Sequence, residues 1–118
     1  MNKDYEHWHY ETDDHGICWL SLDRAGEAVN TLNQAVFDEF SAVISDIEQA
    51  KPLAVVLRSA KSSGFVFGAD IKQFVSLDSA EAAYQLIKGA QDVLNRFESL
   101  PMPTVALISG FCLGGGFE

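Results

Sequence analysis

The strongest constraint on the fold is the alternation of short apolar runs with long amphipathic segments. Residues 17–22, 53–57 and 104–108 are apolar runs of five or six residues, a length typical of buried strands. Between them, residues 31–51 and 79–98 carry apolar side chains at the spacing of one helix face. Strands that alternate with helices predict a layered α/β fold with parallel neighbouring strands.

The N-terminal segment has the pattern of a β-hairpin. Residues 5–12 and 17–23 favour two strands, and the tetrapeptide DDHG between them has the composition of a turn. The run at 17–22 is almost continuously apolar, so we expect both of its faces to be covered.

The helix ends are marked by capping residues. Thr31 and Gln34 have the spacing of a capping box, which predicts that the first helix begins near Thr31. That helix ends before Pro52, and Asp78 or Ser79 caps the second helix. We expect the run that follows, residues 104–108, to be a third buried strand.

Composition and charge narrow the class of protein. The chain has 118 residues, 47% hydrophobic and 21% charged, which suits one soluble globular domain. Its net charge of -9, from 17 acids and 8 bases, repels nucleic acid and anionic membranes. No apolar run approaches the ~20 residues of a membrane helix, so we expect no nucleic-acid partner and no membrane insertion.

The cysteines and histidines carry little chemistry of their own. Cys18 and Cys112 lie in apolar stretches, which predicts free thiols in a reducing compartment and a cytoplasmic protein. His7 and His9 share one strand face, but two histidines are too few for a structural zinc site, and we expect no metal.

The first loop that can carry chemistry is the octapeptide FVFGADIK, residues 65–72. It follows a predicted strand, and ligands of α/β sheets bind outside the carboxyl ends of strands. Gly68 and Ala69 are small, so a ligand can approach the backbone closely. Asp70 has the composition of a cap for the next turn.

The second loop is the nonapeptide GFCLGGGFE, residues 110–118, which also follows a predicted strand. Its glycines leave backbone N–H groups unshielded, and the first N–H groups of a helix lack internal partners. Two N–H donors from separate loops that converge on one oxygen form an oxyanion hole. Glu118 follows directly, as a candidate acid or base. A tight turn is the simpler interpretation of either loop taken alone.

Both loops resemble the two signatures of the crotonase (enoyl-CoA hydratase/isomerase) superfamily, and GEAVNTL, residues 26–32, is similar to the stretch before its first helix. The branch most similar is the N-terminal hydratase part of the α subunit of the bacterial fatty-acid oxidation complex. The resemblance implies a ClpP/crotonase-type fold of repeated β-β-α units. It also implies that residues 1–118 are the N-terminal portion of the domain, truncated at its C-terminal end.

Carried over by position, the resemblance places the oxyanion-hole N–H groups at Ala69 and Gly115 and the first catalytic glutamate at Glu118. A second catalytic glutamate is expected beyond residue 118, so we expect residues 1–118 alone to be inactive. Phe67 departs from the smaller residue that hydratases often have, a change that can reshape the acyl pocket. The expected substrate-binding residues are Gly68, Asp70, Ile71, Gly114 and Ala28.

The implied reaction is hydration of trans-2-enoyl-CoA to 3-hydroxyacyl-CoA in fatty-acid β-oxidation. It needs no cofactor beyond the coenzyme A that the substrate carries, and NAD is expected only for a downstream 3-hydroxyacyl-CoA dehydrogenase domain. The full-length protein is expected to form a homo-oligomer or a complex with a thiolase subunit. Double-bond isomerisation, other acyl-CoA thioester chemistry and a non-catalytic interaction module with the same fold remain alternatives.

Overall fold

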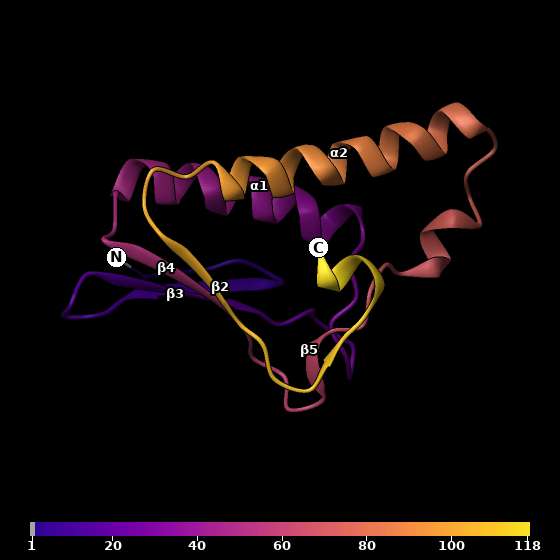
Figure 1. The fold of residues 1–118 in the computed structure, drawn as a ribbon. Helices are drawn as coiled ribbons and strands as arrows, with labels where there is room; N and C mark the ends of the chain where they lie inside the picture. Colours follow the sequence, from indigo (N-terminus) through magenta and orange to yellow (C-terminus); the bar gives the residue numbers. More distant parts are fainter. Residues whose placement is uncertain (1) are drawn as a thin grey trace.

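In the computed structural model, which describes residues 2–118 (side chains from residue 4 onward), two helices cover one face of a mixed β-sheet (Figure 1). The five strands of this sheet lie in the order β1-β2-β3-β4-β6. Their bounds are Asn2–Asp4, Trp8–Thr12, Ile17–Leu22, Ala54–Ser59 and Thr104–Leu107. The first three strands pair antiparallel, and β3, β4 and β6 pair parallel. The predicted α/β class with parallel neighbours is confirmed.

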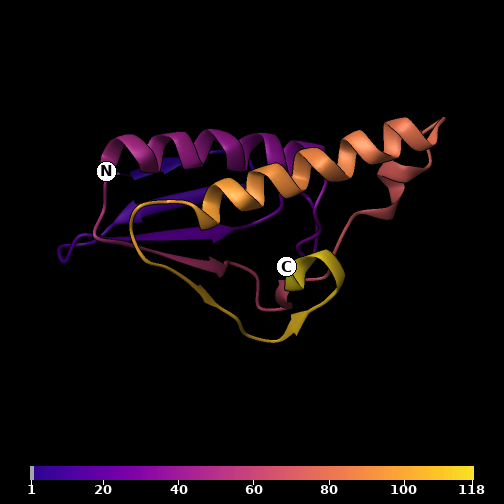
Figure 2. The same ribbon diagram turned by 45° about the horizontal axis from the view of Figure 1, so that its top comes forward.

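Helices α1 (Gln34–Ala50) and α2 (Ala80–Glu98) lie side by side over the sheet (Figure 2). The aromatic rings between the layers form a continuous stack. Trp8 of β2 lies 4.5 Å from Phe40 of α1, and Phe40 lies 5.3 Å from Phe97 of α2, between ring centroids. This stack ties both helices to the sheet, and the core lies around it.

The predicted hairpin is confirmed, although its first strand begins later than residue 5. The Asp13 carboxylate accepts hydrogen bonds from the backbone N–H groups of His15 and Ile17 and so closes the turn. At the other end, the Tyr5 N–H donates to the Trp8 carbonyl at 2.7 Å. Residues 5–8 therefore form a second turn, which returns the short strand β1 onto β2.

The prediction that α1 begins near Thr31 is wrong, because the helix is capped at Asn33. The Asn33 side chain accepts a hydrogen bond from the Val36 N–H at 2.9 Å. The Thr31 hydroxyl is bound instead by the Arg24 guanidinium. Leu32 forms an isolated parallel bridge with Ala69, which keeps residue 32 extended and delays the helix. The predicted end before Pro52 and the cap at Ser79 are confirmed.

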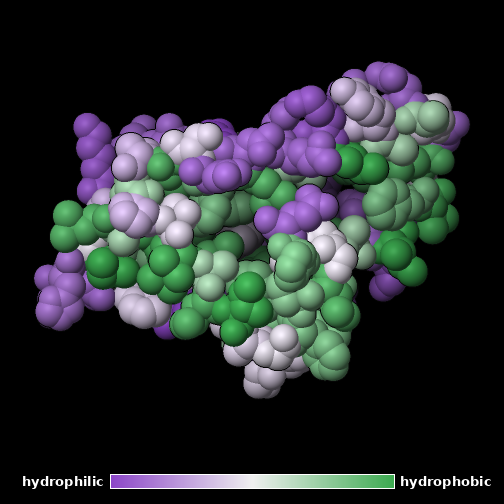
Figure 3. Space-filling view, in the orientation of Figure 1, coloured by the Kyte–Doolittle hydropathy of each residue, from purple (hydrophilic) through white to green (hydrophobic). Residues whose placement is uncertain are grey.

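The prediction that residues 104–108 form a buried strand is also wrong. β6 pairs with β4 and lies at the edge of the sheet, and its Val105 and Leu107 side chains are 55% and 54% exposed. Figure 3 shows hydrophobic residues gathered on the molecular face below the helices. The exposure follows from the edge position, since a central strand has neighbours that cover it and an edge strand does not.

Short elements complete the fold and carry both candidate loops. A second, two-stranded sheet pairs β5 with β7 in parallel. Single 3-10 turns, η1 and η2, follow these strands. Their bounds are Gly64–Val66 (β5), Phe111–Cys112 (β7), Ile71–Phe74 (η1) and Gly114–Phe117 (η2). Within residues 2–118, no helix is long and apolar enough to cross a membrane.

Candidate functional site

The two loops singled out in the sequence leave the small sheet side by side. β5 and β7 are parallel, so the segments that follow them run in the same direction. The Leu113 N–H donates to the Val66 carbonyl at 2.9 Å. Beyond this contact Gly68 and Gly114 face each other, and a methyl group placed on Gly114 would lie 3.9 Å from the Cα of Gly68. The residues that follow these glycines are Ala69 and Gly115.

The N–H of Ala69 is oriented by its own peptide unit. The Leu32 N–H donates to the Gly68 carbonyl at 2.8 Å. In a trans peptide the C=O and the following N–H point in opposite directions, so the Ala69 N–H points away from Leu32. No hydrogen-bond acceptor for it is found among residues 2–118.

The N–H of Gly115 is free for a different reason. It lies at the start of η2, where the first N–H groups of a helical turn have no internal acceptor. The next residues are occupied: the Gly116 N–H donates to Leu113 at 2.9 Å and the Glu118 N–H to Gly115 at 3.2 Å. In the part of the chain that the structure describes, Gly115 therefore presents an unused donor, as Ala69 does.

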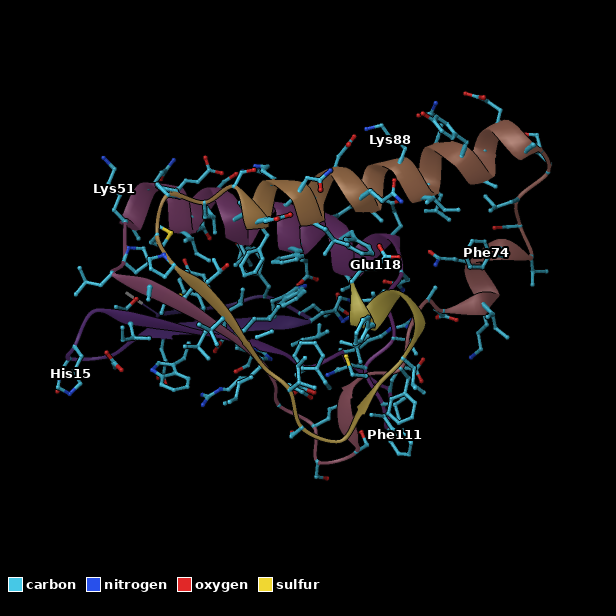
Figure 4. The ribbon with its side chains drawn as sticks, viewed as in Figure 1. His15, Lys51, Phe74, Lys88, Phe111 and Glu118 are labelled. Carbon is cyan, nitrogen blue, oxygen red and sulfur yellow. The ribbon has the colours of Figure 1, made fainter. Side chains whose placement is uncertain are left out.

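Ala69, Gly115 and Glu118 line one cavity of about 280 Å³. Its other walls are mostly apolar, from η1 and α2, and include Phe74, Leu86 and Ile87. Figure 4 shows Glu118 beneath α2 and far from His15 at the hairpin turn. Two free N–H donors and one carboxylate in an apolar cavity can bind a carbonyl group and move a proton beside it.

A larger cavity of about 520 Å³ adjoins the first, between α2 and β6. Gly115 and Glu118 line both cavities, whereas Ala69 lines only the smaller. The carboxylate therefore lies where the two spaces meet, and the smaller cavity is the one that holds both free donors.

The other predicted substrate-binding residues occupy different surroundings. Gly68 and Gly114 have φ of 109° and 53°, backbone that favours glycine, and they set the turns before the two donors. Ile71 is 78% exposed. Ala28 is exposed, and its carbonyl accepts a hydrogen bond from Ser63. Of the two cavities, Ile71 and Ala28 line neither, and their contact with a substrate stays a prediction.

Asp70 is held by two partners. Its side chain accepts from the Lys72 N–H at 3.0 Å, so the predicted capping role is confirmed. It also forms an ion pair with Arg24, with Nη1 and Oδ2 2.8 Å apart. The Arg24 guanidinium, with a smaller contribution from the Lys72 N–H, holds the pKa of the Asp70 carboxyl below its ordinary value. Asp70 is therefore a carboxylate at neutral pH.

Sequence reasoning missed Gln73, which lines the cavity from η1. Its Nε2 donates to the Leu32 carbonyl at 3.2 Å, and its Oε1 is buried without a partner among residues 2–118. A polar residue one turn after Asp70 was the available signal. Phe67 packs on Phe111 at 4.9 Å between ring centroids and lines neither cavity, and its effect on an acyl pocket stays a prediction.

One group of described residues has ligand atoms close enough to share a metal ion. Glu6, His7 and Glu39 come within 4.8 Å of one another. However, His7 Nδ1 accepts a hydrogen bond from the Ala25 N–H at 3.0 Å. In a neutral imidazole the proton then lies on Nε2, the nitrogen that faces Glu39 at 3.9 Å. This tautomer points an N–H toward the Glu39 carboxylate, at a distance too long for a hydrogen bond, and has no lone pair there for a metal.

The sequence model described as "Enoyl-CoA hydratase/isomerase" matches residues 12–118. Curated relatives include proteins named "Fatty acid oxidation complex subunit alpha". The protein from Shewanella halifaxensis is 42% identical over 106 residues, which is 89% of this chain and 15% of that protein. The one from Aliivibrio fischeri is 40% identical over 108 residues, 90% of this chain and 16% of that protein. The chain thus spans about a sixth of the length of these relatives.

Solved structures agree with this match. The enoyl-CoA hydratase/isomerase from Xanthobacter autotrophicus Py2 superposes with a TM-score of 0.83 at 31% identity. An enoyl-CoA hydratase/carnithine racemase from Magnetospirillum magneticum gives a TM-score of 0.85 at 27% identity. In both cases the match covers 96% of this chain and 42% of the other.

Proposed function

The chain belongs to the enoyl-CoA hydratase/isomerase (crotonase) family, and on that premise we propose that the 280 Å³ cavity binds the thioester of an acyl-CoA and hydrates trans-2-enoyl-CoA. The observation that carries the proposal is that Ala69, Gly115 and Glu118, from two separate loops, line one cavity. Both of these N–H groups lack acceptors among residues 2–118.

In the proposed reaction the thioester oxygen lies between the two N–H groups. Water adds its oxygen to C3, and the C2=C3 electron pair moves to the carbonyl oxygen as an enolate. The two donors stabilise this charge, and one such donor is typically worth about 3 kcal/mol. Glu118 takes the proton from the water. A proton returns to C2 from a second acid, which the family resemblance assigns to a position after residue 118. The addition of water is redox-neutral and needs no NAD.

The role is tested by measuring turnover of crotonyl-CoA by the natural full-length protein, followed as loss of the absorbance of the conjugated thioester. We expect Glu118→Gln to lower kcat at least ~100-fold with little change in KM, because the amide keeps the shape but cannot take a proton. Glu81→Gln, in the first turn of α2, is the matched control and should keep full turnover. Unchanged turnover in Glu118→Gln would reject the role.

Isomerisation is the second candidate, because the family model that matches residues 12–118 is described as hydratase/isomerase. A single carboxylate is sufficient to take a proton from C2 of a 3-enoyl-CoA and return it to C4, with the same enolate held by the same donors. Isomerisation of a 3-enoyl-CoA would then increase the absorbance of the conjugated thioester, whereas hydration of a 2-enoyl-CoA decreases it.

Partners and location are part of the same proposal. Relatives named as subunits of a fatty acid oxidation complex support assembly of the full-length protein with other subunits, and a thiolase subunit or a second copy of the chain is the partner that the family resemblance implies. The two cysteines are free thiols, and burial raises the pKa of Cys18. Free thiols support a cytoplasmic location.

A further inference from the structure

Residues 30–32 run beside the first candidate loop, residues 65–72, which we call the Ala69 loop. They form three backbone hydrogen bonds with it. The Phe67 N–H donates to Asn30, the Leu32 N–H to Gly68, and the Asp70 N–H to Leu32, each at 2.8 Å. These bonds lie on both sides of Ala69 along the loop. We refer to residues 30–32 as the strap. The position of Ala69 therefore follows the position of the strap.

The strap is held in place by the fully buried side-chain amide of Asn30. The Asn30 side chain donates to the Leu22 carbonyl, the Ser59 hydroxyl and the Phe65 carbonyl, at 2.9–3.1 Å. The side-chain oxygen of Asn30 accepts a hydrogen bond from the backbone N–H of Arg24 at 2.9 Å. These partners lie at the end of β3, the end of β4 and within β5, so the strap is fixed to the sheet.

An ion pair between Arg24 and Asp70 connects the strap to the Ala69 loop a second time. Arg24 Nη1 lies 2.8 Å from Asp70 Oδ2, and the two side chains are only 10% and 14% exposed. The same Nη1 donates to the Thr31 hydroxyl of the strap. One guanidinium thus holds both the strap and the residue next to Ala69. A partly buried pair of this kind leaves an uncompensated charge when either partner is removed.

We propose that the Arg24–Asp70 ion pair is a positioning clasp that fixes the direction of the Ala69 N–H, an inference that rests on the proposed function. Release of the Asp70 carboxylate leaves the backbone bonds to Leu32 in place but breaks the link through Arg24 to Thr31, so the Ala69 loop and the strap can shift together. Misplacement of a reacting or stabilising group by about 1 Å can cost ~100-fold in rate. Because the N–H acts most strongly on the enolate-like transition state, the loss falls on kcat rather than on KM.

Three substitutions in the natural full-length protein separate the clasp from the cap. Asp70→Asn keeps an acceptor for the Lys72 N–H and the side-chain shape, but removes the charge. Arg24→Met removes the other charge, and Arg24→Lys restores it as a single point donor. With crotonyl-CoA we expect the first two to lower kcat roughly 10–100-fold, with KM within about 2-fold of the parent protein. Arg24→Lys should recover most of that loss.

The matched control is a second ion pair, away from the loops. Arg96 binds Glu48 at 2.7 Å and joins α2 to α1. Arg96→Met removes this pair and should leave kcat unchanged. If Arg24→Met does not fold, the more conservative Asp70→Asn carries the test.

Amide hydrogen exchange provides a readout that needs no substrate. In Asp70→Asn we expect the Leu32 and Asp70 N–H groups to exchange faster than in the parent protein, and those of α1 to be unchanged. Unchanged exchange, or faster exchange with parental kcat, would overturn the clasp. A parent protein without any turnover would reject the proposed function, and exchange would still decide whether the clasp holds the loop.

Discussion

The two loops of the site hold equivalent backbone donors by different means. The Ala69 loop is held by side chains: the buried Asn30 amide, the Arg24–Asp70 pair and the Gln73 amide. The Gly115 loop is held by close backbone packing. A methyl group placed on Gly116 would lie 2.6 Å from Cβ of Val66 and 2.8 Å from its carbonyl oxygen.

This difference predicts how each loop responds to substitution. A loop held by charge and hydrogen bonds loses position in steps, as single partners are removed. A loop held by close packing fails instead when a side chain is added at its tightest position, here Gly116. The expected effects below run from the largest to the smallest.

The largest effect is expected at the base of the Ala69 loop. Asn30→Ala removes all four hydrogen bonds of a fully buried amide, and we expect it to lower the free energy of unfolding by about 3–5 kcal/mol. Urea unfolding measures this loss. Asn33→Ala, which loses only the cap bond of α1, should cost about 1 kcal/mol. Equal losses in the two variants would show that side chains do not hold this loop in particular.

The Gly115 loop is tested by Gly116→Ala. The added methyl group must displace η2 from β5, which should cost about 1–3 kcal/mol and move both Gly115 and Glu118, so turnover should fall as well. Gly89→Ala is the opposite control, since its methyl group meets nothing within 4 Å in the middle of α2. That variant should gain about 0.5–1 kcal/mol. A tolerated Gly116→Ala would contradict the packing account.

Acid should release the Ala69 loop before it affects the Gly115 loop. The ordinary pKa of Asp70 is 3.8 and Arg24 lowers it in the fold. The carboxylate therefore stabilises the fold above pH 3.8, and its contribution disappears as the pH falls through the lower folded value. Below pH 4 the protection of the Leu32 N–H against hydrogen exchange, measured relative to the intrinsic rate at the same pH, should fall in the parent protein, and Asp70→Asn should lack this acid-dependent step.

The hairpin provides the comparison for that acid effect. Hydrogen bonds from the Trp19 indole and the Ile17 N–H lower the pKa of Asp13 as well. Asp13→Asn should remove acid sensitivity from the hairpin and leave that of the Ala69 loop intact. If Asp13→Asn also abolished the response at Leu32, the acid effect would be global and not specific to the clasp.

The smallest effect is expected at Lys88 and Asp92, an exposed ion pair on one face of α2. Exposed helix pairs contribute little, because water and salt screen them. Lys88→Met should give no resolvable change in the urea midpoint or in kcat. A clear loss of activity would show that α2 charges act on the site, which neither loop account includes.

Local patterns in the sequence were sufficient for the helices, the hairpin and both loops. Helix periodicity, turn residues and the glycine cluster are short-range signals, and each led to the correct element. Two loops that each come after a strand indicated one shared site, but the choice of Ala69, Gly115 and Glu118, which line one cavity, came from the family resemblance.

The remaining features depend on contacts distant in the sequence. Thr31 has the composition of a cap, but Arg24 takes its hydroxyl and the Leu32–Ala69 bridge keeps the backbone extended. The exposure of β6 depends on its place in the strand order. The partnership of Arg24 with Asp70 joins residues 46 positions apart, and nothing in either local segment predicts it.

The bridge at Leu32 also connects the candidate site to helix α1. Leu32 bonds the Ala69 loop on one side and directly precedes the Asn33 cap of α1 on the other. The Arg96 guanidinium of α2 binds α1 further along the helix, at Ser41, Ser45 and Glu48. A substitution that shifts the N-terminal end of α1 therefore also moves the peptide that carries the Ala69 donor, and can change the rate without touching the substrate.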